Sequence, residues 1–529
     1  MYATSLRKAG GGLTNLRLPV TRAAWALVAV GAMAGIAGCG GSTSPTGVIP
    51  VPAPTISSFA ASANSINVGQ SSTLTWATVN ATSVTLTGVT GSATSPVTVS
   101  PTVTTDYTLT ATNATGSVSQ TVTIIVNPVG FTLNTTSTPM PRGQIFDLFV
   151  TNSSVYAGRV SFIWGASHIL QPVPAVPSAY IPYSRDPNHA SVANHTLAWY
   201  VANHPTWVVY QCDASGNPLL PTTAITSTAY DFLYGTAPNQ TIDVPLDITN
   251  PDVRTYYFNS FVLPLIQQGW PVIALDNIGL TNHDARCGVY DATGKWVRQY
   301  TGVQNANDPA YVASVLSWVQ SLVGQIHANN VGVVGNLTFP ANTSSLLPSL
   351  TQLINTVDIW IDETGFTGHQ DANVNDAAWL LKFNFVRQNS GRYYVPINRT
   401  TTGTTMLSPP PAGAPTATPA SQSQIDWAVA NYLLYRESHT LLSVTGGEDY
   451  GYFVDAPALN VNLGTASAAP FQTSSSVWER VYSGGIVLVN PSSTQSGTVT
   501  LPSTMTDTHG KVYAGQITVV PNSGVMLKP

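Results

Sequence analysis

Residues 357–366 have the sequence VDIWIDETGF, in which an apolar run ends abruptly at Asp362 and Glu363. Two adjacent carboxylates are unusual in this chain, because only 8% of its 529 residues are charged and globular proteins average about 25%. Side chains alternate along a strand, so we expect one of the two acids to face a pocket. The other can then fix a loop or a helix N-terminus.

The region around this stretch has the pattern of βα units. From about residue 140, apolar strand-like segments alternate with helical periodicity, which is typical of a parallel sheet. Strands are predicted at residues 159–165, 206–212, 242–248, 271–276, 331–336, 357–362, 393–398 and 439–445. This succession predicts a (β/α)8 TIM barrel over residues 131–468. An open doubly wound sheet is the alternative, but the chain has no Gly-rich phosphate turn to favour it.

Helices are predicted between these strands. The segment 250–269 begins with Asn250 as a potential N-cap, followed by Pro251 in the first turn. The segment 309–330 repeats apolar residues at spacings of three and four. Weaker helical patterns occur at residues 191–203, 344–355, 373–388 and 422–436.

Both flanks of the barrel have β texture. Residues 53–127 hold short alternating segments separated by Gly, Asn and Ser turns, which predict an antiparallel β-sandwich. The elements TLTW and YTLTA in this region resemble bacterial immunoglobulin-like (Ig-like) modules of surface proteins, so an Ig-like spacer is expected here. Residues 470–529 alternate in the same way and predict a small C-terminal β-sandwich.

The first 39 residues have the pattern of an export signal. A positive segment precedes the apolar run AAWALVAVGAMAGIAG, which is too short for a comfortable membrane span. The run closes on IAGC (residues 36–39), which resembles the bacterial lipobox, in which the Cys becomes lipid-modified. We therefore expect a lipoprotein signal peptide over 1–39, a flexible linker over 40–52, and a membrane tether through Cys39. Gly40 favours the outer membrane by resemblance, on its periplasmic side or at the cell surface; an ordinary signal peptide with an incidental Cys is the alternative.

Cysteine usage fits an oxidising compartment. If Cys39 carries lipid, only Cys212 and Cys287 remain, and they can form a disulfide outside the cytoplasm. Two separate buried thiols are the alternative.

Several chemistries lack their required parts. A net charge of −5 without a basic stripe argues against nucleic acid as a partner. The chain contains no HExxH, Cys-x-x-Cys pair, P-loop or G-x-S-x-G. We expect no cofactor and no metal. A cation held by Asp276, Asp284 and Asp291 is the weaker alternative, and we expect His168, His283 and His369 to be loop residues rather than ligands.

Polar residues gather where the predicted strands end, which is where a barrel enzyme builds its pocket. Two opposed carboxylates there suit the cleavage of a glycosidic bond. We predict Asp276 as the nucleophile or base and Glu363 as the acid. The alternatives are that Asp276 is a structural helix cap and that Glu363 is an ion-pair partner of Arg399.

Other residues at these strand ends are candidates for substrate binding. They are Trp164, Tyr210, Asp247, Asn277, Asn336, Asp362, Phe366, Arg399 and Glu448. Aromatic rings can stack on sugar faces, but most Trp and Tyr residues of a barrel belong to its core. We therefore expect no more than two of the candidate rings, which also include Tyr450 and Tyr452, to contact substrate. Asp247 and Asp362 are expected to be structural or to orient the substrate.

A family resemblance supports the carboxylate assignment. The segments TWVVYQCD, VPLDITNPDVRTYY, GWPVIALDNIGLTN and VDIWIDETGF resemble extracellular bacterial glycoside hydrolases of TIM-barrel type, known as hypothetical glycosyl hydrolases and distantly similar to endo-α-1,4-polygalactosaminidases. In such families a G-x-D-G-(V/I)-x-L-D-N strand and a later D-x-x-x-(D/E)-E-x-F strand carry the motif carboxylates, which correspond to Asp276 and Glu363. This chain departs from the first motif, because it has Pro271 and Val272 where the family has Asp-Gly.

The sequence thus predicts a glycoside hydrolase that cleaves an extracellular polysaccharide, for example an exopolysaccharide rich in amino sugars or galactose. The alternative is a non-catalytic glycan-binding or adhesion lipoprotein that keeps a degenerate barrel. Sequence alone does not give the gap between the two carboxyl groups, and therefore leaves open whether the reaction retains or inverts the anomeric configuration.

Overall fold

A computed structural model describes most of residues 52–529. The residues it leaves undescribed in this range are 68, 89–92, 102–104, 128–132, 136–139, 148–157, 168, 170–174, 187–194, 220–232, 235–240, 243, 338, 340–343, 369–372, 401–418, 447–452 and 474–475. The predicted signal peptide, the linker up to residue 51 and Cys39 lie outside the described residues. No helix in the described segments is both long and apolar enough to span a membrane.

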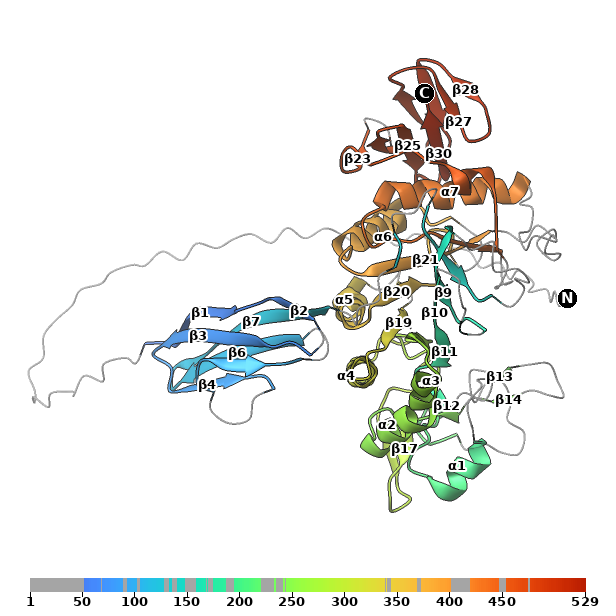
Figure 1. The fold of residues 1–529 in the computed structure, drawn as a ribbon. Coiled ribbons are helices and arrows are strands. Elements are labelled where there is room, and N and C mark those ends of the chain that lie inside the picture. The colour runs from blue at the N-terminus through green and yellow to red at the C-terminus, as the bar shows by residue number, and fades with distance from the viewer. Residues whose placement is uncertain are drawn as a thin grey trace, which may run out of the picture. The chain divides into compact units, whose positions relative to one another are not determined.

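Parallel strands form the centre of the fold (Figure 1). They are β8 (Arg142–Ile145), β9 (Val160–Trp164), β10 (Val176–Pro177), β11 (Ala179–Pro182), β16 (Val272–Asp276), β19 (Gly332–Asn336), β20 (Ile359–Asp362), β21 (Tyr393–Thr400) and β22 (Ser443–Gly446). One sheet has the order β11-β16-β19-β20-β21-β22, and a second has the order β10-β9-β8. The predicted curled parallel sheet is therefore confirmed.

Two links close these sheets into a barrel. Ser178 joins β10 to β11 as one continuous strand, and its backbone N–H donates to the carbonyl of Ile163 in β9. A parallel bridge between Arg142 and Leu442 connects β8 to the residue before β22. Each strand thus has a hydrogen-bonded neighbour on both sides.

Two predicted barrel strands are wrong. In segment 206–212, Val208 forms an antiparallel bridge to Leu246, and in segment 242–248, β15 (Val244–Pro245) pairs antiparallel with β12 (Arg185–Asp186). Both segments belong to a long excursion between β11 and β16. The barrel positions are taken by β8 and by β10 with β11, which are short and lack a clear alternating pattern. Apolar runs indicate strands, but they do not specify the pairing partner.

Helices occur at every predicted helical position. They are α1 (Leu197–Asn203), α2 (Pro251–Tyr257), the π-helix η2 (Phe258–Val262), α3 (Leu263–Gln267), α4 (Pro309–His327), η3 (Ser344–Leu346), α5 (Leu347–Thr356), α6 (Asp376–Gln388) and α7 (Pro419–Tyr435). A further short 3-10 helix, η5, spans Pro457–Asn460. Asn250 caps α2 as predicted, because its side chain accepts from the backbone N–H of Asp252. Figure 1 shows α4, α5 and α6 following one another along one side of β19, β20 and β21.

The excursion that precedes β16 is tied to the loop that follows it. Cys212 lies in the excursion, and Cys287 lies just before the hairpin of β17 (Gly288–Tyr290) and β18 (Trp296–Arg298). The two form a disulfide, as predicted. Two short strands, β13 (Leu233–Tyr234) and β14 (Thr241–Ile242), pair within the same excursion.

The flanking regions form β-sheets with their own cores. In the N-terminal region, β1 (Thr55–Ala61), β3 (Ser72–Val79) and β5 (Val97–Val99) make one sheet. A second contains β2 (Ser65–Asn67), β7 (Gly116–Asn127), β6 (Thr105–Asn113) and β4 (Ser83–Leu86), and the apolar side chains of this region form a single cluster. The Ig-like relationship of this region stays a prediction.

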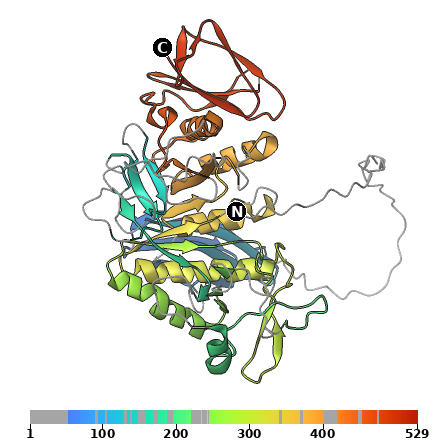
Figure 2. The ribbon, with the colours of Figure 1, turned by 90° about the vertical axis from the view of Figure 1, so that its right-hand side faces the viewer.

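The C-terminal strands are antiparallel, as predicted. They are β23 (Phe471–Gln472), β24 (Trp478–Tyr482), β25 (Gly485–Asn490), β26 (Gly497–Thr500), β27 (Met505–Asp507), β28 (Val512–Tyr513), β29 (Gln516–Val519) and β30 (Ser523–Lys528). Figures 1 and 2 show these strands beyond α7. The Tyr482 hydroxyl donates to the Leu433 carbonyl of α7, which joins this region to the helix layer.

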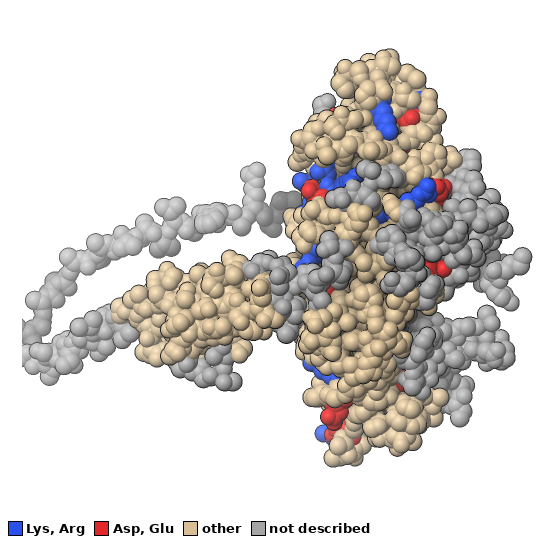
Figure 3. Space-filling model, viewed as in Figure 1, with Lys and Arg blue, Asp and Glu red and all other residues tan. Residues whose placement is uncertain are grey.

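The apolar core has two layers in the barrel region. An inner cluster fills the barrel with side chains such as Phe162, Ala274 and Ile361. A larger outer cluster lies between the strands and the helices. Charges are sparse on the face drawn in Figure 3, and blue and red residues adjoin in several small groups.

Candidate active site

Strand alternation brings two acids to the mouth of the barrel, where the strands end. Ala274 faces the barrel interior, and Asp276 lies two residues further along β16. Ile361 likewise faces the interior, and Glu363 lies two residues further on, just past the end of β20. Since side chains two apart in a strand share a face, both acids continue the inner rows. They are called the carboxyl pair below.

A single amide joins the carboxyl pair. Asn336, the last residue of β19, donates from Nδ2 to Asp276 Oδ1 at 2.7 Å and to Glu363 Oε2 at 3.2 Å. Since one nitrogen bonds both oxygens, they lie no further apart than the two bonds laid end to end, about 6 Å. The structure therefore brings together the two acids that the sequence analysis selected.

Donors surround the Asp276 carboxylate. Besides the bond from Asn336, Oδ2 accepts from the Tyr180 hydroxyl at 2.5 Å and from Asn277 Nδ2 at 3.1 Å. Burial, followed by the negative charge of Glu363, raises the pKa of Asp276, while the bonds from Tyr180 and Asn336 lower it in part. Asp276 caps none of the helices in the described residues, so the alternative role as a helix cap is not observed.

Glu363 is the more accessible member of the pair. Its side chain is 27% exposed, and Oε1 lies 3.2 Å from the buried guanidinium of Arg399 in β21. The ion pair between Glu363 and Arg399 is therefore present, and Glu363 also lies close to Asp276. Arg399 holds one oxygen of Glu363 and Asn336 holds the other, which fixes the orientation of the carboxylate.

A pocket of about 370 Å³ adjoins the pair, and its lining includes Asn277, Asn336 and Glu363. The lining also includes Tyr183, Arg185, His283, Asp284 and Tyr311, which follow β11 and β16 or begin α4. The pocket is thus continuous with Glu363.

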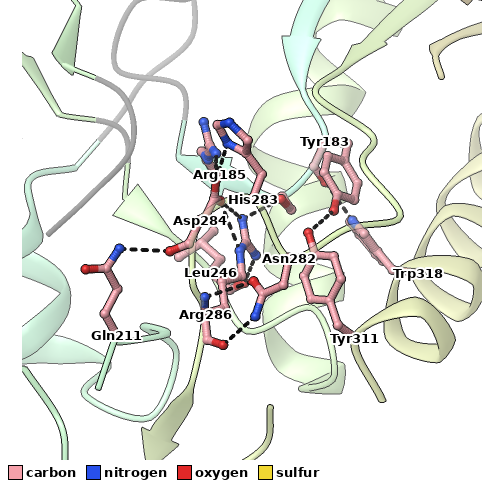
Figure 4. Close-up of polar contacts among 11 residues, drawn as sticks. Tyr183, Arg185, Gln211, Leu246, Asn282, His283, Asp284, Arg286, Tyr311 and Trp318 are labelled. Atoms are coloured by element: carbon pink, nitrogen blue, oxygen red, sulfur yellow. Dashed lines mark hydrogen bonds and ion pairs between the residues drawn. The ribbon is translucent and has the colours of Figure 1, made fainter. Parts of the chain in front are cut away.

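A buried charge network lies among the residues of this second group (Figure 4). Asp284 accepts from Arg185 at 2.5 Å and from Arg286 at 2.9 Å. Although burial raises the pKa of Asp284, the two guanidinium groups together hold it well below its usual value. Asp291 instead accepts bonds within its own turn, from Thr293 and Lys295. The three acids considered for a cation do not meet, and the described part of the chain contains no group of three metal-binding side chains.

Asp362 points away from the pocket, as strand alternation requires. It is fully buried, and its Oδ2 accepts from Lys382 Nζ at 2.8 Å and from the Tyr394 hydroxyl at 3.1 Å. Its Oδ1 accepts from Thr364, just after the strand. Asp362 therefore anchors the end of β20 and is structural.

Three other predicted binding residues are not at the pocket. Tyr210 lies in the excursion, because segment 206–212 is not a barrel strand. Its side chain is buried against Tyr290 of β17. Phe366 is buried in the outer core, where its ring stacks on Tyr435. Asp247 accepts from Thr249 and Gln299 and is not among the residues that line the pocket. For Tyr210 and Phe366 the prediction of substrate contact is wrong.

Trp164 does lie at the barrel mouth. Its ring packs at 5.5 Å, edge to face, on Tyr180, whose hydroxyl bonds Asp276. Tyr180 itself was missed by the sequence analysis, since the segment that contains it was not predicted to be a strand. Five residues with predicted roles lie outside the described residues, namely Glu448, Tyr450, Tyr452, His168 and His369. His283 is described, and it is an exposed residue beside Asp284.

Comparisons with known proteins add little to this geometry. No protein-family model matches the chain, and no curated protein matches it. Similar solved structures include an α-amylase from Geobacillus thermoleovorans complexed with acarbose (11% identity, 67% of this chain, 77% of that chain, TM-score 0.33) and a maltogenic α-amylase from Thermotoga neapolitana (12%, 67%, 77%, 0.33). A β-L-arabinopyranosidase from Geobacillus stearothermophilus is another (11%, 74%, 96%, 0.35). Similarities with TM-scores this low carry no argument about the function of this chain.

The Tyr180 bond gives a test of this site. Replacing Tyr180→Phe removes a donor that lowers the pKa of Asp276, so the pKa of Asp276, already raised, should rise further. Carboxyl ¹³C NMR titration of Asp276 would measure it.

Tyr394→Phe is the matched control, because Tyr394 donates to Asp362 on the outer side of the barrel wall. It should leave the Asp276 titration unchanged. A lower or unaltered pKa of Asp276 in Tyr180→Phe would contradict the described geometry.

Proposed function

We propose that this protein is a glycoside hydrolase and that Asp276 and Glu363 are its catalytic carboxylates. The observation that carries the proposal is the Asn336 amide shared by both acids beside an open pocket. Burying two carboxylates close together is costly unless their surroundings compensate. Both acids lie at the ends of parallel strands, which is where a barrel enzyme positions its reacting groups.

The separation of the pair favours a retaining mechanism. Retaining glycosidases hold their carboxyl groups about 5–5.5 Å apart, whereas inverting enzymes leave about 6.5–9.5 Å for a water molecule. The upper limit of about 6 Å set by Asn336 leaves no such gap between the two bonded oxygens. We therefore propose a double displacement through a covalent glycosyl–enzyme intermediate.

The surroundings distinguish the two roles. Asp276 accepts hydrogen bonds on both oxygens. This arrangement stabilises an anion in a fixed orientation, which suits the nucleophile. Glu363 is partly exposed and lines the pocket, so it can exchange protons with water and suits the acid. In the first step Asp276 attacks the anomeric carbon while Glu363 protonates the departing glycosidic oxygen.

The second step regenerates the enzyme. Glu363 takes a proton from water, and the water oxygen displaces Asp276 from the anomeric carbon. Burial is the largest cause of the raised pKa of Asp276 and persists throughout the reaction. The charge of Glu363 is the second cause. When Glu363 carries the proton, that cause is absent and Asp276 ionises more readily.

We further propose an extracellular polysaccharide as the substrate and the bacterial envelope as the location. The location follows from the lipobox-like segment that ends at Cys39. An oxidising compartment agrees with the disulfide between Cys212 and Cys287.

Substituting the acids tests the activity. Asp276→Asn and Glu363→Gln should each reduce reducing-end release from a panel of exopolysaccharides by about 10³-fold or more. Polysaccharide binding, measured by affinity electrophoresis, should persist in both variants because the pocket is kept.

Glu479→Gln is the control, since Glu479 lies in the C-terminal β24. It should retain full activity. Wild-type protein that binds polysaccharide but never cleaves it would favour the non-catalytic glycan-binding alternative.

Location is tested separately through Cys39. A lipid-anchored protein should partition with membranes, and Cys39→Ala should move it to the soluble fraction because the acylated side chain is lost. Cell fractionation with immunoblotting measures this, and Cys39→Ala protein that stays in the membrane fraction would contradict the proposed anchor.

A further inference from the structure

Three buried polar atoms at the barrel mouth have no hydrogen-bond partner within the described part of the chain. They are Trp164 Nε1, Asn336 Oδ1 and Thr445 Oγ1. All three residues are buried, being 4% exposed or less. Native proteins pair nearly all such atoms, so a group of unpaired ones requires an explanation, and a ligand that supplies the missing partners is one.

The residues that carry these atoms bond the carboxyl pair or adjoin a residue that does. Trp164 packs on Tyr180, which donates to Asp276. Thr445 is the register partner of Arg399 across β21 and β22, and Arg399 bonds Glu363. Asn336 bonds both acids directly. Unpaired buried atoms also occur elsewhere, such as the Tyr435 hydroxyl in the outer core.

The orientation of the Asn336 amide follows from its neighbours. Two carboxyl oxygens face one end of the amide, and ionised carboxylates only accept hydrogen bonds, so that end is the NH₂ donor when both acids are ionised. The carbonyl Oδ1 is then directed away from the two bonded carboxylate oxygens. It is an acceptor without a donor among the described residues.

The three atoms differ in chemistry. Trp164 Nε1–H can only donate, Asn336 Oδ1 can only accept, and the Thr445 hydroxyl can do either. None carries a charge. A sugar hydroxyl both donates and accepts, so neutral hydroxyl groups complement all three atoms.

We propose that Trp164 Nε1, Asn336 Oδ1 and Thr445 Oγ1 bind the hydroxyl groups of the sugar unit held at the carboxyl pair, and that this unit is a neutral hexose. The assignment rests on the proposed glycoside hydrolase function, which it deepens by naming the class of sugar. A uronic acid is disfavoured because its carboxylate would lie beside Asn336 Oδ1 and two further carboxylates. These three atoms are called the hydroxyl ring below.

Free monosaccharides allow the ring to be tested without any cleavage. Wild-type protein is titrated with glucose, galactose and mannose, with their uronic acids, and with glucosamine and galactosamine, using ligand-observed NMR. At least one neutral hexose should bind more tightly than its charged analogues, with a dissociation constant in the millimolar range expected of a single sugar.

Two substitutions remove ring atoms while preserving shape. Trp164→Phe keeps an aromatic ring but lacks Nε1–H, and Thr445→Val replaces the hydroxyl by a methyl group. Each should weaken binding of the preferred hexose by about 2- to 10-fold, the usual effect of losing one neutral hydrogen bond. Trp360→Phe is the matched control, because Trp360 Nε1 is already bonded to the Leu337 carbonyl; it should leave the affinity unchanged.

The outcomes separate this inference from the proposed hydrolysis. If hydrolysis depends on Asp276 and Glu363 but Trp164→Phe and Thr445→Val leave hexose affinity intact, the hydroxyl ring is overturned. It is also overturned if no neutral hexose binds, or if a uronic acid or a hexosamine binds more tightly than every neutral hexose. If hexose binding depends on Trp164 and Thr445 while no polysaccharide is cleaved, the ring stands and the proposed hydrolysis fails.

Discussion

The site depends on one shared donor, the Nδ2 group of Asn336, which bonds both Asp276 and Glu363. Two carboxylates repel each other, and burial strengthens the repulsion because protein screens charge less than water does. The repulsion is offset by neutral donors from Asn336 and Tyr180 on one acid and by the Arg399 cation on the other. Removing any of these groups should alter the titration or the orientation of an acid.

The barrel wall makes this convergence possible. Glu363 can face inward only because Asp362, one residue earlier, faces outward, where Lys382 compensates its buried charge. Thus the two adjacent acids of the opening stretch perform different tasks. One anchors the end of β20 from the outside, and the other enters the mouth of the barrel.

Local signals in the sequence were sufficient for much of this arrangement. Acids at the ends of β16 and β20, the cap at Asn250 and the pairing of Cys212 with Cys287 all follow from alternation, capping chemistry or cysteine arithmetic. These features depend on a few neighbouring residues or on a count. Side-chain period alone also indicated that only one of two adjacent acids would face the pocket.

Features that depend on strand pairing could not be predicted in this way. Segment 206–212 has a convincing strand pattern but pairs outside the barrel, so Tyr210 was wrongly expected at the pocket. Tyr180 was missed for the complementary reason, because its short strand has no distinctive period. Register and neighbours are set by contacts between residues far apart in the chain, which a single sequence does not display.

The central claim is that Asn336 holds the two acids too close together for a water molecule to attack between them. The most direct measurement is proton NMR of the first sugar released from an α- or β-linked substrate, recorded before mutarotation. The account predicts that the new reducing end keeps the anomeric configuration of the bond that was cleaved. A first product of the opposite configuration would contradict it.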